Sequence, residues 1–103
     1  MLEILVLSIN ATDARHRYLA LVDQLREHDI NYRQNFNQLT LTTEHTRTRF
    51  IFLKKHTKEL KNKPDIVCGH DPDIVEKYPD VTFTNHEPIY YIKQKELDEW
   101  NTI

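Results

Sequence analysis

The sequence predicts one α/β domain, because short apolar runs typical of buried strands alternate with helical patterns. Its 103 residues can form a single core, and a charged fraction of 29% is ordinary for a folded protein. The run Leu2–Ile9 fits a central strand covered on both faces. The stretch Pro64–Asp73 joins an apolar run to the only glycine and to a helix start. We therefore expect one domain over 1–103, a mixed sheet of about five to six strands with helices packed on it.

A helix is expected after the first strand. Asn10 or Thr12 can act as its N-cap, and the helix should end near His28–Asp29. Apolar residues recur in this segment at three- and four-residue steps: Ala14, Tyr18, Leu21, Val22 and Leu25. Such spacing places one apolar stripe against the sheet.

A β-hairpin is expected next. Gln38–Thr43 alternates like a half-exposed strand, with Leu39 and Leu41 facing the core. A tight connection at Glu44–Thr46 leads to Arg47–Leu53, which begins with alternation and ends as an apolar run. The second strand should therefore lie deeper in the sheet than the first.

The rest of the chain predicts shorter elements. In order, we expect an exposed helix or a mobile connection at Lys54–Lys63, a strand at Ile66–Cys68, a short helix from Asp71, a strand at Val81–Thr84, a strand at Ile89–Ile92 and a helix at Lys93–Trp100. The predicted order is thus β-α-β-β-(α)-β-α-β-β-α, which is typical of a layered α/β domain.

Composition excludes several classes of function. One glycine in the chain rules out both the phosphate loop and the dinucleotide fingerprint, which need several. The lone Cys68 lies in an apolar run, which predicts a buried thiol and fits a reducing cytosol. The first apolar run is too short to span a bilayer and has no basic leader, so no membrane association is expected.

The order of elements resembles the middle of the ATPase core of superfamily 2 helicases and phage terminases, after their phosphate loop. The matching residues are Ile4–Ser8, Leu21–Glu27, Leu39–Leu53 and Ile66–Asp71. In those proteins the last strand runs into Asp-Glu, whereas here Cys68-Gly-His-Asp71 takes its place. The resemblance therefore implies the fold without its catalysis and without a cofactor. It implies a small, non-enzymatic, phage-encoded protein that acts in the cytoplasm by binding a protein or a protein–nucleic-acid complex in DNA handling.

An alternative hypothesis is a metal-dependent phosphoester hydrolase. His70, Asp71 and Asp73 follow a strand end, and His86 with Glu87 would follow a neighbouring one, offering ligands for zinc or manganese. Gly69-His70 also resembles the Gly-His element of calcineurin-like metallophosphoesterases, whose earlier ligands would correspond here to Asn10 and Asp13. Helix capping explains Asp71 and Asp73 without a metal, and it is the preferred interpretation of these two residues.

Basic residues cluster after the hairpin. Arg47 and Arg49 should lie on its exposed face and are followed by Lys54, Lys55 and Lys58. Arg15, Arg17, Arg33, Tyr32 and Phe36 can extend this surface. It can contact phosphates or dock an acidic protein, or simply keep the segment solvated.

Aromatic residues gather near the end of the chain. Ile89-Tyr-Tyr-Ile92, Phe83 and Trp100 suit either an interface or the packing of a last strand and helix. For nucleophilic catalysis the chain offers Cys68 or Ser8 with a histidine, but a buried thiol has a raised pKa and attacks poorly.

Overall fold

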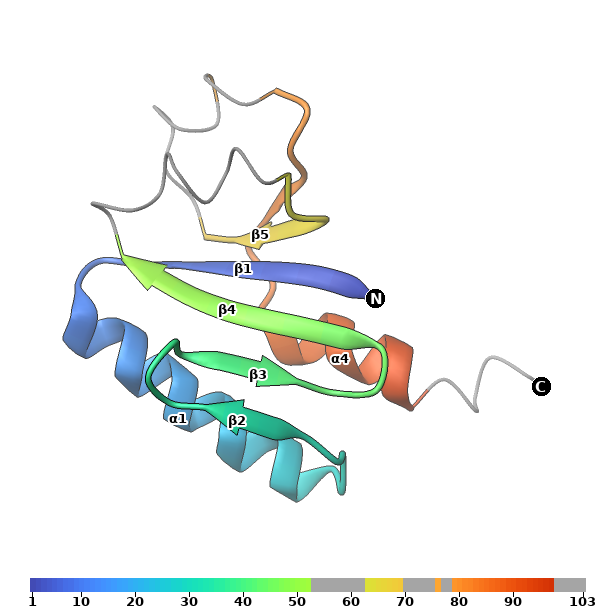
Figure 1. Ribbon diagram of the computed structural model, residues 1–103. Helices are drawn as coiled ribbons and strands as arrows, with labels where there is room; N and C mark the ends of the chain where they lie inside the picture. Colours follow the sequence, from blue (N-terminus) through green and yellow to red (C-terminus); the bar gives the residue numbers. More distant parts are fainter. Residues whose placement is uncertain (53–62, 70–75, 77–78, 98–103) are drawn as a thin grey trace.

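The structure is a computed structural model of residues 1–103, and it describes residues 1–52, 63–69, 76 and 79–97 (Figure 1). The elements are β1 (Leu2–Ser8), α1 (Ala11–Glu27), β2 (Arg33–Asn35), β3 (Thr40–Thr42), β4 (Thr46–Phe52), β5 (Ile66–Cys68), β6 (Phe83–Thr84) and α4 (Pro88–Glu96). The predicted α/β class is confirmed.

The six strands form one mixed sheet in the order β2-β3-β4-β1-β5-β6. β3 runs antiparallel to both of its neighbours, whereas β4, β1, β5 and β6 are mutually parallel. The parallel strands therefore end at one edge of the sheet, called here the carboxyl edge, and begin at the opposite amino edge (Figure 1). The hairpin prediction is confirmed, and β4 lies deeper than β3 because it also pairs with β1.

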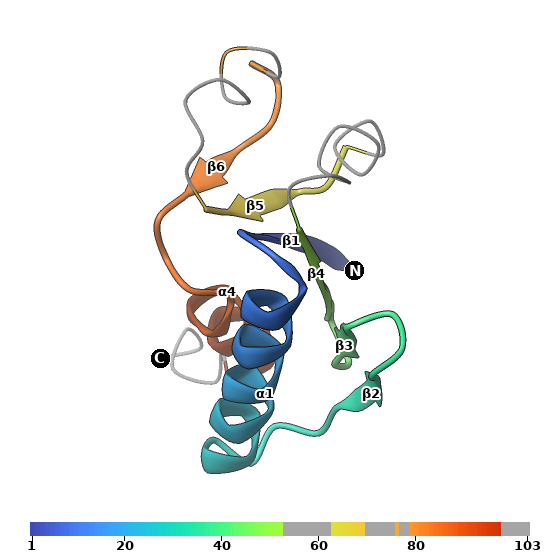
Figure 2. The ribbon, with the colours of Figure 1, turned by 90° about the vertical axis from the view of Figure 1, so that its left-hand side faces the viewer.

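β1 is buried on both of its faces, as its apolar run predicts. Ile4 and Val6 belong to the cluster beneath the helices, whereas Leu5 and Leu7 belong to a second cluster with Ile51 and Val67 on the opposite face. Figure 2 shows α1 and α4 side by side on one side of the sheet. We call that side the helix face and the other the opposite face.

α1 follows its predicted pattern closely. Its N-cap is Asn10, whose side chain accepts a hydrogen bond from the Asp13 backbone N–H at 2.8 Å. The predicted stripe is the buried stripe, made of Ala14, Tyr18, Leu21, Val22 and Leu25. The Tyr18 ring makes edge-to-face contacts with Phe36 and Phe50, which link α1 to the strands below.

The prediction of a strand at Ile89–Ile92 is wrong, because these residues lie in α4. Pro88 occupies the start of the helix, where its missing N–H costs nothing, and Ile92 is 0% exposed on the inner side. The predicted helix at Lys93–Trp100 is thus only the second half of α4, which is capped at Leu97. Residues 98–100 lie outside the described part.

β2 was not predicted at all, since Arg33–Asn35 is polar and exposed. It is an edge strand that pairs with β3 through its backbone. Leu39 precedes β3 in a turn with φ 48°, and its side chain is partly buried against the core rather than part of the strand. The predicted strand Val81–Thr84 is confirmed over Phe83–Thr84 only.

Two predictions lie outside the described residues. They are the exposed helix or connection at Lys54–Lys63, apart from Lys63 itself, and the short helix beginning at Asp71, apart from Glu76, which is helical. Between them, β5 confirms the predicted strand at Ile66–Cys68. Gly69 follows with φ +134°, a conformation that favours glycine, and a Cβ there would be in tight contact with Leu7 Cβ at 3.1 Å.

Candidate binding surfaces

Arginines from two strands share the opposite face of the sheet. Leu41 points to the core beneath the helices, so its neighbours Thr40 and Thr42 point the other way. The register pairs Thr42 with both Arg33 and Arg47. It pairs Thr40 with Asn35 and Arg49 in the same manner. We call this set of six residues on β2, β3 and β4 the arginine strip.

Arg47 of this strip is held by Glu3, its partner across the β1–β4 pair. The Arg47 guanidinium donates from Nε to Glu3 Oε2 at 3.0 Å and from its terminal nitrogen to Oε1. This pairing raises the pKa of Arg47 above its ordinary value. The positive charge of Arg47 is therefore partly neutralised, and its guanidinium is fixed in place.

The sequence predicted the strip only in part. Arg47 and Arg49 share a face, as expected, but Lys54, Lys55 and Lys58 lie outside the described residues. Arg33 joins them because β2 pairs with β3, a contact that the polar sequence did not signal. Arg15 and Arg17 lie on α1, and they therefore belong to the other side of the sheet.

A second surface lies at the start of α4. The His86 ring stacks on the Tyr90 ring with centroids 4.2 Å apart, and the Tyr91 ring meets both edge to face. Tyr90 is 45% exposed. Glu87, the N-cap residue of α4, makes no side-chain capping bond. These four residues, His86, Glu87, Tyr90 and Tyr91, are called here the aromatic surface.

The aromatic surface is anchored by Thr84 of β6. The Thr84 hydroxyl oxygen accepts hydrogen bonds from the Tyr91 hydroxyl at 2.7 Å and from the His86 backbone N–H at 3.1 Å. The first bond ties the Tyr91 ring to the sheet, and the second ties the His86 backbone to it. Restricting these groups before a partner binds lowers the entropy cost of binding.

Of the metal ligands predicted at these two strand ends, only His86 and Glu87 are described. His70, Asp71 and Asp73 lie outside the described residues, so that metal site stays a prediction. Asn10 and Asp13, the earlier positions of the same hypothesis, act in α1's first turn: Asp13 accepts from the Ile9 backbone N–H and pairs with Arg17.

The Cys68 thiol is buried, as predicted. Burial, with a further contribution from the Glu87 carboxylate, raises its pKa to about 12. A thiol with that pKa is protonated at neutral pH and is a weak nucleophile. The Ser8 hydroxyl at the end of β1 is buried too and has no hydrogen-bond partner among the described residues.

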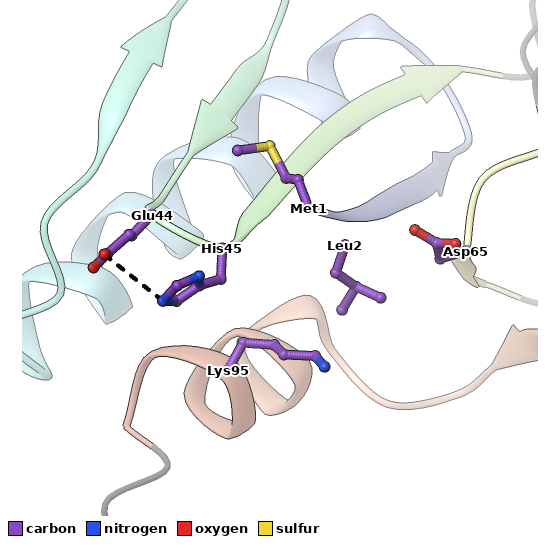
Figure 3. Close-up of a pocket in the computed structure, with 6 residues that line it drawn as sticks. All are labelled: Met1, Leu2, Glu44, His45, Asp65 and Lys95. Atoms are coloured by element: carbon purple, nitrogen blue, oxygen red, sulfur yellow. Dashed lines mark ion pairs between the residues drawn. The ribbon is translucent and has the colours of Figure 1, made fainter.

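The amino edge carries a pocket that the sequence did not predict (Figure 3). It has a volume of about 490 Å³ and is lined by Met1, Leu2, Glu44, His45, Asp65 and Lys95. Asp65 accepts a hydrogen bond from the Glu3 backbone N–H at 2.8 Å, and this bond aligns the start of β5 with β1. The pocket is thus lined by two apolar side chains and by charged side chains of both signs.

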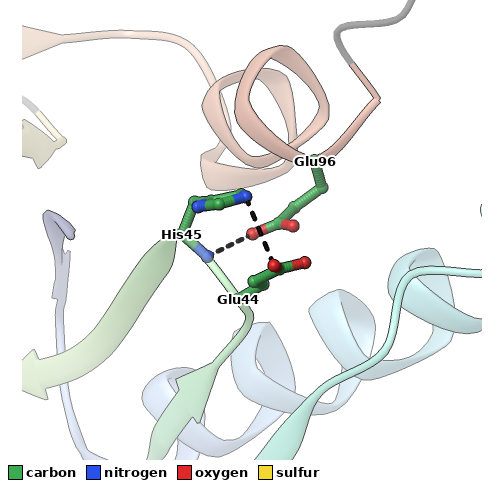
Figure 4. A group of neighbouring side chains, drawn as sticks. All are labelled: Glu44, His45 and Glu96. Atoms are coloured by element: carbon green, nitrogen blue, oxygen red, sulfur yellow. Dashed lines mark hydrogen bonds and ion pairs between the residues drawn. The ribbon is translucent and has the colours of Figure 1, made fainter.

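Beside this pocket, Glu96 of α4 meets the turn between β3 and β4 (Figure 4). Its Oε1 accepts from the Thr43 hydroxyl at 2.5 Å and from the His45 backbone N–H at 2.7 Å. Ligand atoms of Glu44, His45 and Glu96 lie within 4.8 Å of one another, a separation that suits a metal ion. Sequence spacing could not indicate this group, since Glu96 is 51 residues from His45.

Comparisons with known proteins add no homologue: no family model, no curated protein and no solved structure matches the chain. Within the described part, neither helix is long and apolar enough to cross a membrane.

Proposed function

We propose that this chain is a non-enzymatic binding protein that docks on a protein or protein–nucleic-acid complex through its aromatic surface. The observation that carries the proposal is the exposed stack of His86 on Tyr90, fixed to the sheet through Tyr91 and Thr84. Exposed aromatic side chains held in one conformation are the residues that dominate protein interfaces.

The neighbouring Glu87 supports a partner with a basic group. Its carboxylate makes no capping bond to α4, and it lies one turn before Tyr90 on the same helix. A lysine or arginine of a partner can pair with this carboxylate while its stem packs on the Tyr90 ring. The surface thus combines an apolar anchor with a charge that selects the partner.

The cellular setting is a proposal from the sequence. The resemblance to helicase and terminase ATPase cores supports a phage-encoded protein that acts on DNA-handling machinery. The single cysteine, buried in β5, supports a reducing compartment such as the cytoplasm.

The proposal is tested by affinity capture from host-cell lysate with three forms of the chain: wild type, Tyr90→Ala and Leu19→Ala. Leu19 is 50% exposed on α1 and serves as the matched control for loss of an exposed hydrophobic side chain. We expect one partner, identified by mass spectrometry, to be retained by wild type and Leu19→Ala and lost by Tyr90→Ala. Recovery of the same partner with all three forms would contradict the proposed surface, and ATP turnover by the purified chain would contradict a non-enzymatic role.

A further inference from the structure

We propose that Glu44, His45 and Glu96 bind one zinc ion, and that this ion fastens the end of α4 to the turn between β3 and β4 (Figure 4). One ligand atom of each residue lies within 4.8 Å of the ligand atoms of the other two. The group offers one imidazole nitrogen and two carboxylate oxygens, all of which are ligands that zinc accepts. The site is separate from the aromatic surface and shares no residue with it.

The Glu96 carboxylate is held in place by the fold before any ion binds. Its Oε1 accepts hydrogen bonds from the Thr43 hydroxyl at 2.5 Å and from the His45 backbone N–H at 2.7 Å. Its Oε2 has no hydrogen-bond partner in the part of the chain that the structure describes. Hydrogen bonds of this kind orient the ligands of metal sites in proteins. The fold therefore uses one oxygen of Glu96 and leaves the second oxygen without a partner.

The charge of the group favours a divalent cation. Glu44 and Glu96 bring two carboxylates close together, and like charges at this separation repel each other. Glu96 is also the last residue of α4, where the negative end of the helix dipole disfavours a carboxylate. A protonated His45 offsets only one of the two negative charges, whereas a divalent ion bound by the neutral imidazole offsets both. Lys95, the neighbouring cation on α4, is directed away from Glu44 (Figure 3).

The imidazole ligand favours zinc over magnesium and calcium. Those two ions prefer sites made of oxygen atoms, whereas imidazole suits zinc. His45 Nε2 and Glu44 Oε1 lie 3.8 Å apart, on side chains that are 55% and 80% exposed. Two ligands of one tetrahedral zinc ion lie about 3.3 Å apart, so small rotations of these exposed side chains complete the geometry. Both residues also line the amino-edge pocket, which gives an ion access from solvent.

The experiment titrates zinc chloride into the untagged chain after treatment with a chelator. Calorimetry measures binding, and circular dichroism measures the unfolding temperature. Wild type should bind one zinc ion and unfold at a higher temperature with zinc than with EDTA, because an ion that binds only the folded state stabilises it. Magnesium at the same concentration should give a smaller shift.

Two ligand variants and one matched control locate the ion. His45→Ala and Glu96→Gln should each weaken zinc binding at least about tenfold, the loss typical of removing even a hydrogen-bond partner of a metal ligand. Glutamine at position 96 keeps an oxygen that can accept from Thr43 and His45, so this variant tests the metal ligand with the fold preserved. The control is His16→Ala, which removes an exposed histidine of α1 and should leave zinc binding unchanged.

Several outcomes would overturn this inference. One is the absence of zinc binding to wild type, and another is weak binding that wild type, His45→Ala and Glu96→Gln share, which would show an adventitious ion only. Loss of binding in His86→Ala but not in His45→Ala would place the ion at the strand ends instead. Binding that leaves the unfolding temperature of wild type unchanged would show that the ion does not fasten α4 to the turn.

Discussion

The two helices that share one face of the sheet begin in different ways. At the start of α1, Asn10 caps the Asp13 N–H, and Asp13 in turn accepts from the Ile9 N–H. At the start of α4, Glu87 stands in the N-cap position and its side chain makes no capping bond. The start of α1 is therefore closed by its own side chains, whereas the start of α4 leaves a carboxylate and an aromatic ring available for a partner.

α4 is held in place elsewhere along its length. Ile92 lies in the core under the sheet, and Glu96 at its far end accepts two hydrogen bonds from the turn between β3 and β4. A helix fixed in its middle and at its end does not need a strong cap. This difference is consistent with the proposal that the start of α4 serves binding, while its middle and end serve stability.

The strongest test of this separation removes the middle anchor. Ile92→Ala should lower the free energy of unfolding by about 2 to 5 kcal/mol, because the side chain is fully buried and its loss leaves a cavity. Urea denaturation measures the change, with the exposed Gln94→Ala on the same helix as control. Equal, small effects of the two substitutions would show that α4 is not anchored through Ile92.

Removing the cap of α1 should have the next largest effect. Asn10→Ala leaves the Asp13 N–H without its acceptor and should cost about 1 kcal/mol, within the 0.5 to 2 kcal/mol typical of N-caps. Thermal unfolding followed by circular dichroism would detect this loss. Asn10→Ser, which keeps a capping oxygen, should recover most of the stability, and failure to do so would argue against a capping role.

Lowering the pH should reduce the stability that Asp13 contributes at the start of α1. The hydrogen bond from the Ile9 N–H, with a smaller contribution from Arg17, lowers the pKa of Asp13 below its ordinary value. The charged form is therefore favoured by folding. Ionised Asp13 contributes its full stabilisation of the fold above the pKa of the unfolded state, which is about 4. That stabilisation is lost as the pH falls through the lower pKa of the folded state. Asp13→Asn should flatten this part of the stability curve below about pH 5, and an unchanged curve would contradict the assignment.

The smallest effect is expected at the start of α4. Glu87→Ala should change the free energy of unfolding by less than about 0.5 kcal/mol, because no capping bond is lost. The comparison with Asn10→Ala is direct, since both substitutions are made at N-cap positions of helices on the same face. A loss as large as that of Asn10→Ala would mean that Glu87 supports α4 and is not reserved for a partner.

Much of the fold could be predicted from local patterns of apolar residues in the sequence. The stripe from Ala14 to Leu25 and the runs that became β1 and β5 were predicted correctly, because their apolar spacing matches the faces they bury. The run Ile89–Ile92 misled, because four apolar or aromatic residues suit a strand as well as a helix. Pro88 and the three-residue spacing of Ile89 and Ile92 were the available helix signals.

The candidate surfaces were harder to predict from the sequence than the fold. Arg33 belongs to the strip because β2 pairs with β3 at the edge of the sheet. The residues of β2 are polar and its pairing uses backbone hydrogen bonds, so the sequence carries no apolar pattern that would predict this strand. The aromatic run was noticed, but the stack of His86 on Tyr90 depends on the helical geometry that the prediction missed. Glu96 and the amino-edge pocket depend on long-range contacts, which periodicity cannot predict.

The central place of β1 has a consequence for synthesis on the ribosome. Once the chain has emerged as far as Phe52, β1 can pair with β4 on one side, but its other partner, β5, follows only at Ile66. Until then an apolar strand exposes a row of unpaired backbone groups, which is the template that promotes aggregation. Nascent chains stalled between these two points should therefore be the most dependent on chaperones.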